Sequence, residues 1–434
     1  MEEIDGFVWV DAPPRSHCWN ETNKNPDNDG LTCRISAIEE ALKPLKASLW
    51  SLNKYIHEHP ELGYEEHKTH DALTAFMQRQ KGWQVTRSAF GIETAWTAVY
   101  SSQSPGPVVA FNAEMDALPG LGHACGHNLI AIASVAAGLA TAEVMRGFHL
   151  PGKVVIIGTP AEEGGGGKIK LLKAGAYAGV DVSLISHPSI VNNSPMVRTT
   201  AFSKVEVEYH GRSAHAANSP WLGINALDAL IVAYNSISVL RQQTQPGDVI
   251  GLQITNGGNA PNVIHAFSAG KVVLRATSAS RLQDLQRKVE ACFRAGAEAT
   301  GARLEIKKTP GYKDHVPNRV MAASYTKYWE ALPDMPGPRI PPDGQLTFVK
   351  ASTDQGDISY SMPSLNASFA IPPGPKGGPP HSPDFEKASS TEAAFDRAMR
   401  VGKAMAGTAV DLFADPELLD KVRAQWRRDM AAAS

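Results

Sequence analysis

Side chains that commonly bind metal ions occur at five places along the chain, each at or just beyond the carboxyl end of a predicted strand. They are Glu114-Met115-Asp116, Gly122-His123-Ala124-Cys125-Gly126-His127, Glu162-Glu163, His187 and His381. Open α/β sheets bind their ligands at this edge. Carboxylates, imidazoles and a thiolate gathered there would suit two divalent cations. Such ions polarise an amide carbonyl and lower the pKa of a bridging water.

The adjacent pair Glu162-Glu163 allows two roles in such a site. A hydrolase needs one carboxylate to bind metal and a different one to accept the water's proton and pass it to the leaving amine. The four glycines that follow, residues 164–167, allow close approach of the backbone. Taken alone, a Glu-Glu pair is usually a solvated surface, and a Cys-x-His pair is usually incidental. The shared position at strand ends is therefore the informative observation.

The elements that would position these residues alternate between strand and helix. Apolar runs predict strands, and helical spacing of apolar residues predicts helices. The alternation indicates an α/β domain with three layers and a mixed, largely parallel sheet. The predicted strands are 94–100, 108–113, 153–158 and 182–186, and the predicted helices are 36–58, 69–80, 128–145 and 168–174.

The pattern changes near residue 198. Strands at 203–209, 249–255, 271–277 and 303–307 alternate with helices, one from Asn218-Ser219-Pro220 to 243 and one at 280–300. This order, strand-helix-strand-strand-helix-strand, is ferredoxin-like. Because α/β elements resume afterwards, at 320–331, at 368–371 and in a final helix from Ser389, we expect an inserted α+β domain. The predicted parts are an N-terminal arm (1–35), a catalytic domain (36–198 and 309–434) and an inserted lid and dimerisation domain (199–308).

Composition narrows the class of protein. With 434 residues, 43% hydrophobic and 20% charged residues and a formal net charge of -2, the chain is typical of a soluble protein with two domains. The charge balance argues against a nucleic-acid binder. The longest apolar segment, 129–145, contains Ser134, Thr141 and Glu143 and predicts a buried helix, not a membrane span. No secretory signal pattern is visible, and four cysteines are too few for a disulfide scaffold, so we expect a cytoplasmic protein.

Five motifs carry a resemblance to a known family. The chain resembles the aminoacylase and glutamate-carboxypeptidase superfamily of metallopeptidases from about residue 36 to 410. The nearest branch comprises hippurate hydrolase, auxin-amino-acid amidohydrolases, aminobenzoyl-glutamate hydrolase and aminoacylase-like dipeptidases. The motifs are His57-Glu58-His59-Pro60-Glu61-Leu62-Gly63, Met115-Asp116-Ala117-Leu118-Pro119, Gly122 to His127, Glu162-Glu163-Gly164 and Gly211-Arg212-Ser213-Ala214-His215-Ala216.

The resemblance implies a role for each matching residue. Cys125 would bridge two ions, zinc or alternatively manganese or cobalt, and the other ligands would be His127, Glu163, His187 and His381. Glu162 would be the general base, and Asp116 would orient a ligand. His215 would reach the active site of a partner subunit and stabilise the oxyanion. Asn262 and Arg275 would hold the substrate carboxylate, although Arg275 could equally pair with a nearby acid.

Three positions depart from the pattern of the branch. Asn128 follows the Cys-Gly-His motif where Asp is usual, an exchange that resembles the aminoacylase-like dipeptidases. Glu114 stands where Asp is commoner, and His265 replaces a proline. These changes leave the ligand set complete and leave the choice of substrate open.

The sequence therefore predicts a homodimeric, two-metal amidohydrolase, with the dimer formed through the inserted domain. Its substrate would be a small amide: an N-acyl amino acid, a dipeptide or a related conjugate. No nucleic acid or membrane partner is expected. Two alternatives stay open: an amide-forming or other acyl-transfer enzyme on the same metal site, and a catalytically silent binding protein.

Overall fold

The computed structural model describes residues 3–4, 7–8, 29–333, 338–341 and 346–433. The chain divides into two compact units. Unit 1 comprises Met1–Arg198, Val316–Phe348 and Asp357–Ala431, and unit 2 comprises Thr199–His315, Val349–Gly356 and Ala432–Ser434. Most of the predicted N-terminal arm, including Cys18, lies outside the described residues.

Unit 1 is built on a six-stranded sheet in the order β14-β7-β5-β6-β4-β3. The first four strands run parallel, and β4 and β3 continue the sheet antiparallel. The prediction of a mixed, largely parallel sheet is therefore confirmed. The strands are β3 (Trp83–Thr86), β4 (Trp96–Ser101), β5 (Val108–Glu114), β6 (Lys153–Thr159), β7 (Val182–Ser189) and β14 (Ser364–Ala370).

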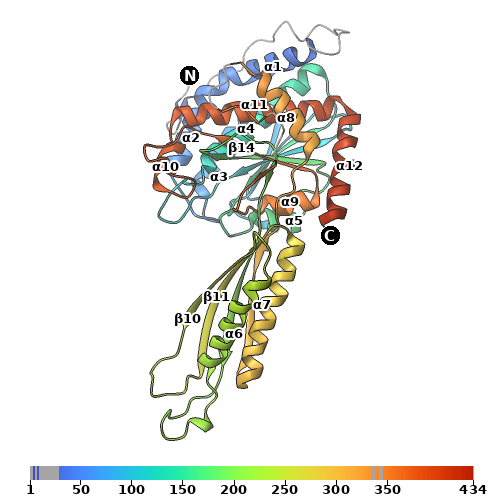
Figure 1. Ribbon diagram of the computed structural model, residues 1–434. Coiled ribbons are helices and arrows are strands. Elements are labelled where there is room, and N and C mark those ends of the chain that lie inside the picture. The colour runs from blue at the N-terminus through green and yellow to red at the C-terminus, as the bar shows by residue number, and fades with distance from the viewer. Residues whose placement is uncertain (1–2, 5–6, 9–28, 334–337, 342–345, 434) are drawn as a thin grey trace. The chain divides into compact units, whose positions relative to one another are not determined.

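Helices cover both faces of this sheet (Figure 1). Along β5, Val109 and Phe111 point into the larger hydrophobic core, while Ala110 joins a smaller core with Leu171 on the opposite face. This alternation is the period of two expected of a strand with both faces buried. The helices of the larger core are α1 (Asp29–Leu42), α2 (Lys46–Glu58), α3 (His67–Gln78), α4 (His127–Phe148), α8 (Arg319–Ala331), α10 (Pro383–Ser389), α11 (Glu392–Ala414) and α12 (Pro416–Ala433), and the smaller core includes α5 (Gly167–Lys173) and part of α9 (Gln355–Ser361).

Helix α4 is the central helix of the larger core. Among the described residues it is the one helix long and apolar enough to cross a membrane, and 94% of its most apolar window is buried inside the protein. It packs against α11, α1 and β5. The apolar segment thus forms a core helix, as its interrupted sequence predicts.

Unit 2 has the predicted strand-helix-strand-strand-helix-strand order, and its antiparallel sheet runs β10-β11-β9-β12. Both helices pack on one face of the sheet, against residues such as Val205, Val207 and Leu274. The elements are β9 (Ala201–His210), α6 (Ala226–Leu240), β10 (Val249–Asn256), β11 (Phe267–Ala276), α7 (Ala279–Thr300) and β12 (Arg303–Tyr312).

Several predicted elements were wrong in their bounds; the final helix predicted from Ser389, for example, is α11 and α12, and α10 ends at Ser389. The helix predicted at 36–58 is two helices separated by the 3₁₀ turn η2 (Lys43–Leu45), because the ring of Pro44 cannot sit inside a continuous α-helix. The helix predicted to begin at residues 218–220 begins after Asn225, whose side chain accepts a hydrogen bond from the Leu227 amide at 3.1 Å. Strand β7 extends to Ser189, so His187 lies inside a strand and not after one.

Candidate metal centre

The carboxyl ends of two neighbouring strands bring most of the predicted site residues together in unit 1. Asp116 follows β5, Glu162 and Glu163 follow β6, and His127 opens α4. His127 Nε2 lies 3.8 Å from Glu162 Oε2 and 3.9 Å from Glu163 Oε1. Cys125, His127 and Glu163 each offer a ligand atom within 4.8 Å of the others.

The two remaining predicted ligands contact this cluster through different carboxylates. His381 Nε2 lies 3.3 Å from Glu163 Oε1. His187 Nε2 lies 3.3 Å from Glu114 Oε2, which is itself 3.3 Å from His127 Nε2. All five predicted ligands therefore belong to one connected cluster. The connection to His187 runs through Glu114, which the sequence did not predict as a site residue.

Asp116 positions two parts of the site relative to each other. Its carboxylate oxygens accept hydrogen bonds from the backbone amides of Glu162 at 3.0 Å and Glu163 at 2.9 Å. Its backbone carbonyl lies 2.6 Å from His127 Nδ1, and its Oδ1 lies 3.2 Å from the same nitrogen. Asp116 therefore fixes both the orientation of His127 and the turn that carries the two glutamates.

The turn before the glutamates has a backbone conformation that needs support. Ala161 has a φ of 55°, in the left-handed region that costs an L-residue about 1–2 kcal/mol. Its amide donates to Glu66 Oε1 at 2.8 Å, and Thr94 donates to the other oxygen of Glu66 at 2.7 Å. Gly63 lies so close that a Cβ there would be 2.8 Å from the Ala161 Cβ. The motif around residues 57–66 thus shapes the glutamate turn.

A second orienting contact reaches His187. Its Nδ1 lies 2.9 Å from the side-chain oxygen of Asn366, a buried residue on the neighbouring parallel strand β14. Metal-binding histidines commonly use their second ring nitrogen in this way. Asn366 therefore fixes which nitrogen of His187 is directed into the cluster.

Burial and neighbouring charges shift the pKa values of several groups in this cluster. Burial alone would raise the pKa of Glu114, but the Lys168 ammonium and the imidazoles of His187 and His127 outweigh it and hold that pKa well below its usual range. Burial opposes a charge on His127, yet the Cys125 thiol and the carboxylates of Asp116 and Glu114 hold its pKa well above its usual value. Removal from water and the Glu163 carboxylate raise the pKa of the Cys125 thiol. Such a group is a thiolate when a cation lies beside it.

The residues fit a pair of divalent cations. Among the described residues, Glu114 Oε2, His127 Nε2 and Glu163 Oε1 are buried atoms that make no hydrogen bond within the protein. A buried polar atom left this way costs about 1–3 kcal/mol, and these atoms belong to two of the four groups among the described residues that could hold an ion. Sulfur, imidazole nitrogen and carboxylate oxygen are the ligands typical of zinc.

The other predicted site residues, His215, Asn262 and Arg275, belong to unit 2. His215 Nδ1 accepts hydrogen bonds from the amides of Ala217 and Asn218 at 3.2 and 3.1 Å, so its Nε2 carries the proton. The backbone carbonyl of Asn262 accepts from the Ala216 amide, which places these two loops side by side within the unit.

Arg275 lies on β11, on the face of the unit 2 sheet opposite the helices. Its guanidinium stands 4.7 Å from the centre of the Phe202 ring and donates to Ser352 Oγ at 2.8 Å. Neither partner is an acid, so these contacts leave its charge available for a carboxylate.

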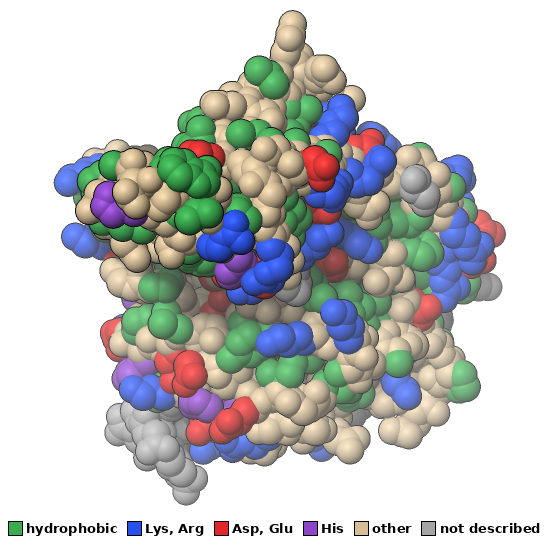
Figure 2. Space-filling model, turned by 90° about the horizontal axis from the view of Figure 1, so that it is seen from below, with side chains coloured by type: hydrophobic (Ala, Val, Ile, Leu, Met, Phe, Trp, Pro, Cys, Tyr) green, Lys and Arg blue, Asp and Glu red, His purple; other side chains and the backbone are tan. Residues whose placement is uncertain are grey.

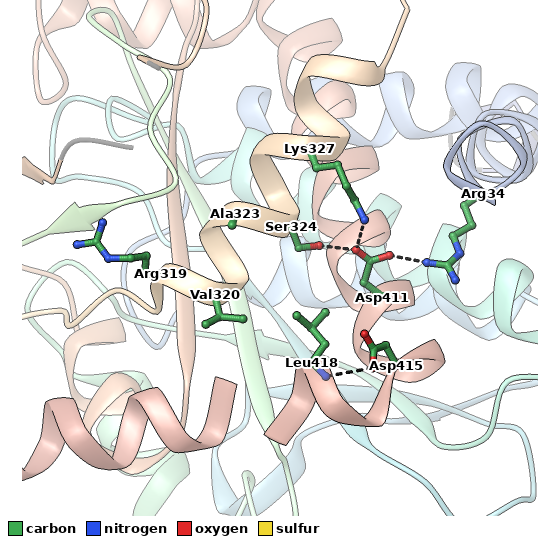
Figure 3. A pocket seen from close by; sticks show the side chains of 9 residues that line it. All are labelled: Arg34, Arg319, Val320, Ala323, Ser324, Lys327, Asp411, Asp415 and Leu418. Atoms are coloured by element: carbon green, nitrogen blue, oxygen red, sulfur yellow. Dashed lines mark hydrogen bonds and ion pairs between the residues drawn. The ribbon is translucent and has the colours of Figure 1, made fainter. Parts of the chain in front are cut away.

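A pocket on unit 1 shares no residue with the metal cluster (Figure 3). Asp411 lies at its wall, where Arg34 and Lys327 each approach the carboxylate to 2.6 Å. Ser324 and Tyr328 also donate to it, at 2.8 and 2.7 Å. These bonds tie α1, α8 and α11 together, and we assign Asp411 a structural role.

The fold and the metal cluster define a metal-dependent hydrolase of small amide substrates. Residues 110–406 match the model of "Peptidase family M20/M25/M40", and the chain belongs to that family. The predicted superfamily resemblance is therefore confirmed.

Relatives match nearly the whole chain. It is 39% identical over 406 residues to Xaa-Arg dipeptidase of Mus musculus, covering 91% of this chain and 90% of that protein. It is 26% identical to one of the subunits of p-aminobenzoyl-glutamate hydrolase from Escherichia coli, covering 90% of this chain and 94% of that one. The crystal structure of a dinuclear metal binding peptidase from Bacillus subtilis has the same fold, with a TM-score of 0.64 at 20% identity, over 85% of this chain and 99% of that one.

Four residues of the site escaped sequence reasoning as functional residues: Glu114, Lys168, Asn366 and Glu66. The signal for Glu114 was present, since it ends a buried strand two residues before Asp116. Lys168 follows the four glycines directly, but its contact with Glu114 spans 54 residues and is visible only in the fold. Asn366 and Glu66 likewise act through neighbours that are distant in the sequence.

Proposed function

We propose that this protein is a dipeptidase that cleaves the amide bond of dipeptides with a carboxy-terminal arginine or similar basic residue. The observation that carries the reaction type is the cluster of acceptor atoms at the strand ends, with Glu162 beside it. The preference for a basic residue is supported by the 39% identity to Xaa-Arg dipeptidase over nearly the full length of both chains. The relative named p-aminobenzoyl-glutamate hydrolase supports an acyl-glutamate as the second candidate substrate.

The mechanism assigns a separate task to each residue. The ions would be held by Cys125, His127, Glu163, His187 and His381, and when bound they would polarise the amide carbonyl and acidify a water. Glu162, which is 5% exposed, would take the proton from that water and deliver it to the leaving amine.

Three residues of unit 2 would act on the substrate directly. His215, with its proton on Nε2, would donate to the oxyanion in the active site of a partner subunit. Arg275 and Asn262 would bind the substrate's terminal carboxylate, for which a guanidinium fork is well suited.

Exchange of Glu162 tests the general base. We expect Glu162→Gln to lower kcat for a Xaa-Arg dipeptide by about 10²–10⁴-fold, the usual contribution of general acid-base catalysis. Its bound metal should stay at the wild-type value, because the amide removes only the proton acceptor. The matched variant Glu163→Gln should lose bound metal as well as activity. Wild-type turnover by Glu162→Gln would refute this assignment.

A substrate panel tests the specificity. We expect kcat/KM to be highest for Ala-Arg and Ala-Lys, and at least about tenfold lower for Ala-Leu, N-acetyl-arginine and p-aminobenzoyl-glutamate, since a fold-change of this size is about 1.4 kcal/mol of differential binding. Preference for p-aminobenzoyl-glutamate would replace the basic-dipeptide proposal with the second candidate. Product formation only from amine plus acyl donor would favour the acyl-transfer alternative, and no turnover of any kind would favour a silent binding protein.

We propose zinc as the native metal and manganese or cobalt as functional substitutes. A ligand set with one cysteine and three histidines favours zinc over harder ions that prefer oxygen. Elemental analysis of protein purified without added metal should find zinc, close to two per chain. Manganese at the same occupancy would show that metal supply, and not ligand softness, decides the occupant.

We further propose a homodimer formed through unit 2. Strand β10 lies at the edge of its sheet and exposes Val249 and Ile254. On α6, Ile231 and Tyr234 are exposed three residues apart, and so lie on one side of the helix. Figure 2 shows one face of the molecule on which hydrophobic side chains lie exposed among charged ones. An unpaired edge with apolar side chains is a template for pairing with a second copy.

Light scattering tests this dimer. The wild type should have twice the monomer mass, and Ile254→Lys together with Ile231→Lys should give a monomer. The control Val191→Lys exchanges an exposed valine of unit 1 and should leave the dimer intact. A monomeric wild type would contradict the proposal.

A further inference from the structure

Glu114 ends β5 inside the metal cluster, and no predicted role accounts for it. Its side chain is fully buried, as is that of Lys168, whose ammonium lies 2.6 Å from Glu114 Oε1. The other oxygen, Oε2, is 3.3 Å from both His127 Nε2 and His187 Nε2. The three groups can present ligand atoms within 4.8 Å of one another.

The hydrogen bonds of the two histidines determine what faces Glu114. His127 Nδ1 lies 2.6 Å from a backbone carbonyl oxygen, and His187 Nδ1 lies 2.9 Å from the side-chain oxygen of Asn366. Both oxygens are acceptors, so each imidazole donates through Nδ1. An imidazole that binds a cation is neutral, and one that donates through Nδ1 then offers the Nε2 lone pair as the ligand.

Three potential ligand atoms therefore converge: two imidazole nitrogens and Glu114 Oε2. Glu114 Oε2 and His127 Nε2 are 3.3 Å apart, and both are buried atoms that make no hydrogen bond within the described protein. A structural ion pair would explain Oε1 and Lys168. It would not account for the second oxygen, which lies 3.3 Å from two imidazole nitrogens in a geometry that allows one cation to bind all three atoms.

We propose that Glu114 is an additional ligand of the ion held by His127 and His187. Lys168 binds one carboxylate oxygen and leaves the other as a single-atom ligand. With Cys125 as the bridge, this ion has four protein ligands, the number typical of closed zinc sites. The ion of Glu163 and His381 has three protein ligands including the bridge, and so keeps an open position for substrate or water.

The asymmetry predicts one tight and one weaker ion. The proposal rests on the two-metal site, and Co²⁺ binding separates its failure from the failure of that site. Apo-protein should be titrated with Co²⁺, with the visible d–d absorption and the bound-metal count as readouts. The wild type should bind two equivalents, the first more tightly. If the wild type binds none, the two-metal function itself fails.

Glu114→Gln should lower the affinity for one of the two Co²⁺ ions by at least about tenfold, the lower end of the loss seen when contacts to a metal site are removed. Glu114→Asp should do the same, because the shorter side chain withdraws its oxygen while keeping a charge beside Lys168. The control Asp411→Asn makes the same kind of exchange at a buried ion pair outside the site and should bind both ions as the wild type does. If both Glu114 variants bind two ions with wild-type affinity and spectrum, Glu114 is not a ligand.

A second variant, Lys168→Met, tests the proposal if a Glu114 variant does not fold. Without the ammonium, the buried carboxylate depends more strongly on the ion for a positive partner. Co²⁺ should therefore raise the unfolding temperature of Lys168→Met by more than it raises that of the wild type. An equal or smaller rise would overturn the proposal.

Discussion

At the scale of single residues, the site depends on side chains that orient the ligands. Asp116 and Asn366 each fix one histidine through its Nδ1, and this contact determines which nitrogen faces the metal cluster. Asn366 does so from a different strand, 179 residues away in sequence. The metal ligands are thus arranged before an ion arrives, and the ion needs to order few groups when it binds.

Loss of the Asn366 acceptor should weaken the site without removing a ligand. We expect Asn366→Leu, which has a similar branched shape, to lower metal affinity or kcat/KM by about 10–100-fold. Leucine offers no acceptor, so His187 would be free to rotate. Asn366→Asp keeps an acceptor oxygen and should therefore retain more activity than Asn366→Leu. The check is a metal competition assay beside steady-state kinetics. Equal affinity in Asn366→Leu and wild type would show that β7 alone orients His187.

The sequence predicted the ligands better than it predicted the residues that support them. Cys125, His127 and Glu163 are of types that bind metal and stand in short motifs at strand ends, so their role is visible locally. Lys168 and Asn366 are ordinary polar residues whose partners are distant in the sequence. Only the packing of β14 beside β7, and of α5 below β5, brings them to the site.

At the scale of elements, the segment between α2 and α3 packs against the turn that carries Glu162 and Glu163 and fixes its conformation. Gly63 lies against Ala161, and Tyr64 donates to the Gly165 carbonyl at 2.7 Å. Glu61 accepts hydrogen bonds from the amides of Lys68 and Thr69 at the start of α3, which fixes this segment. A change here should therefore reach Glu162 and Glu163 without touching them.

Gly63→Ala tests this coupling. The new Cβ would lie 2.9 Å from the Ala161 Cα, so the turn must shift, at a cost of about 1–3 kcal/mol in the free energy of unfolding. We expect a lower kcat as well, measured beside a denaturant titration. The control Gly30→Ala, whose Cβ meets nothing within 4 Å, should leave kcat unchanged. Unchanged kcat and stability in Gly63→Ala would mean that the turn adapts freely.

Sequence periodicity predicted most of the helices and strands, but it located fewer of their first and last residues. Parallel strands buried on both faces read as apolar runs, and β5 and β6 were predicted within one residue of their bounds. Pro44 divides a segment whose apolar spacing looks continuous, because spacing alone does not record a backbone break. The short strand β3 was missed, since Trp83–Thr86 is too brief to establish a period.

At the scale of the whole molecule, metal binding should contribute to stability. The cluster places several carboxylates beside a thiol in a buried space, and an ion that neutralises them stabilises only the folded state. Occupancy at 100 times Kd stabilises by about 2.7 kcal/mol for each site.

Removal of metal should therefore lower the unfolding temperature of the wild type, and added zinc should restore it. Differential scanning fluorimetry of chelated and zinc-loaded protein measures this difference. In Glu163→Gln the rise with zinc should be smaller than in the wild type. A wild-type unfolding temperature that does not respond to zinc would show that the folded protein is equally stable without metal in the cluster.

The central claim is that Cys125, His127, Glu163, His187 and His381 hold two cations in unit 1. Anomalous diffraction at the zinc edge, from crystals of zinc-loaded protein, tests it most directly. The account predicts two peaks, each about 2.0–2.3 Å from its ligand atoms, with one peak between His127 and His187 and the other between Glu163 and His381. A map with no peak at these residues, or with its peaks elsewhere, would contradict it.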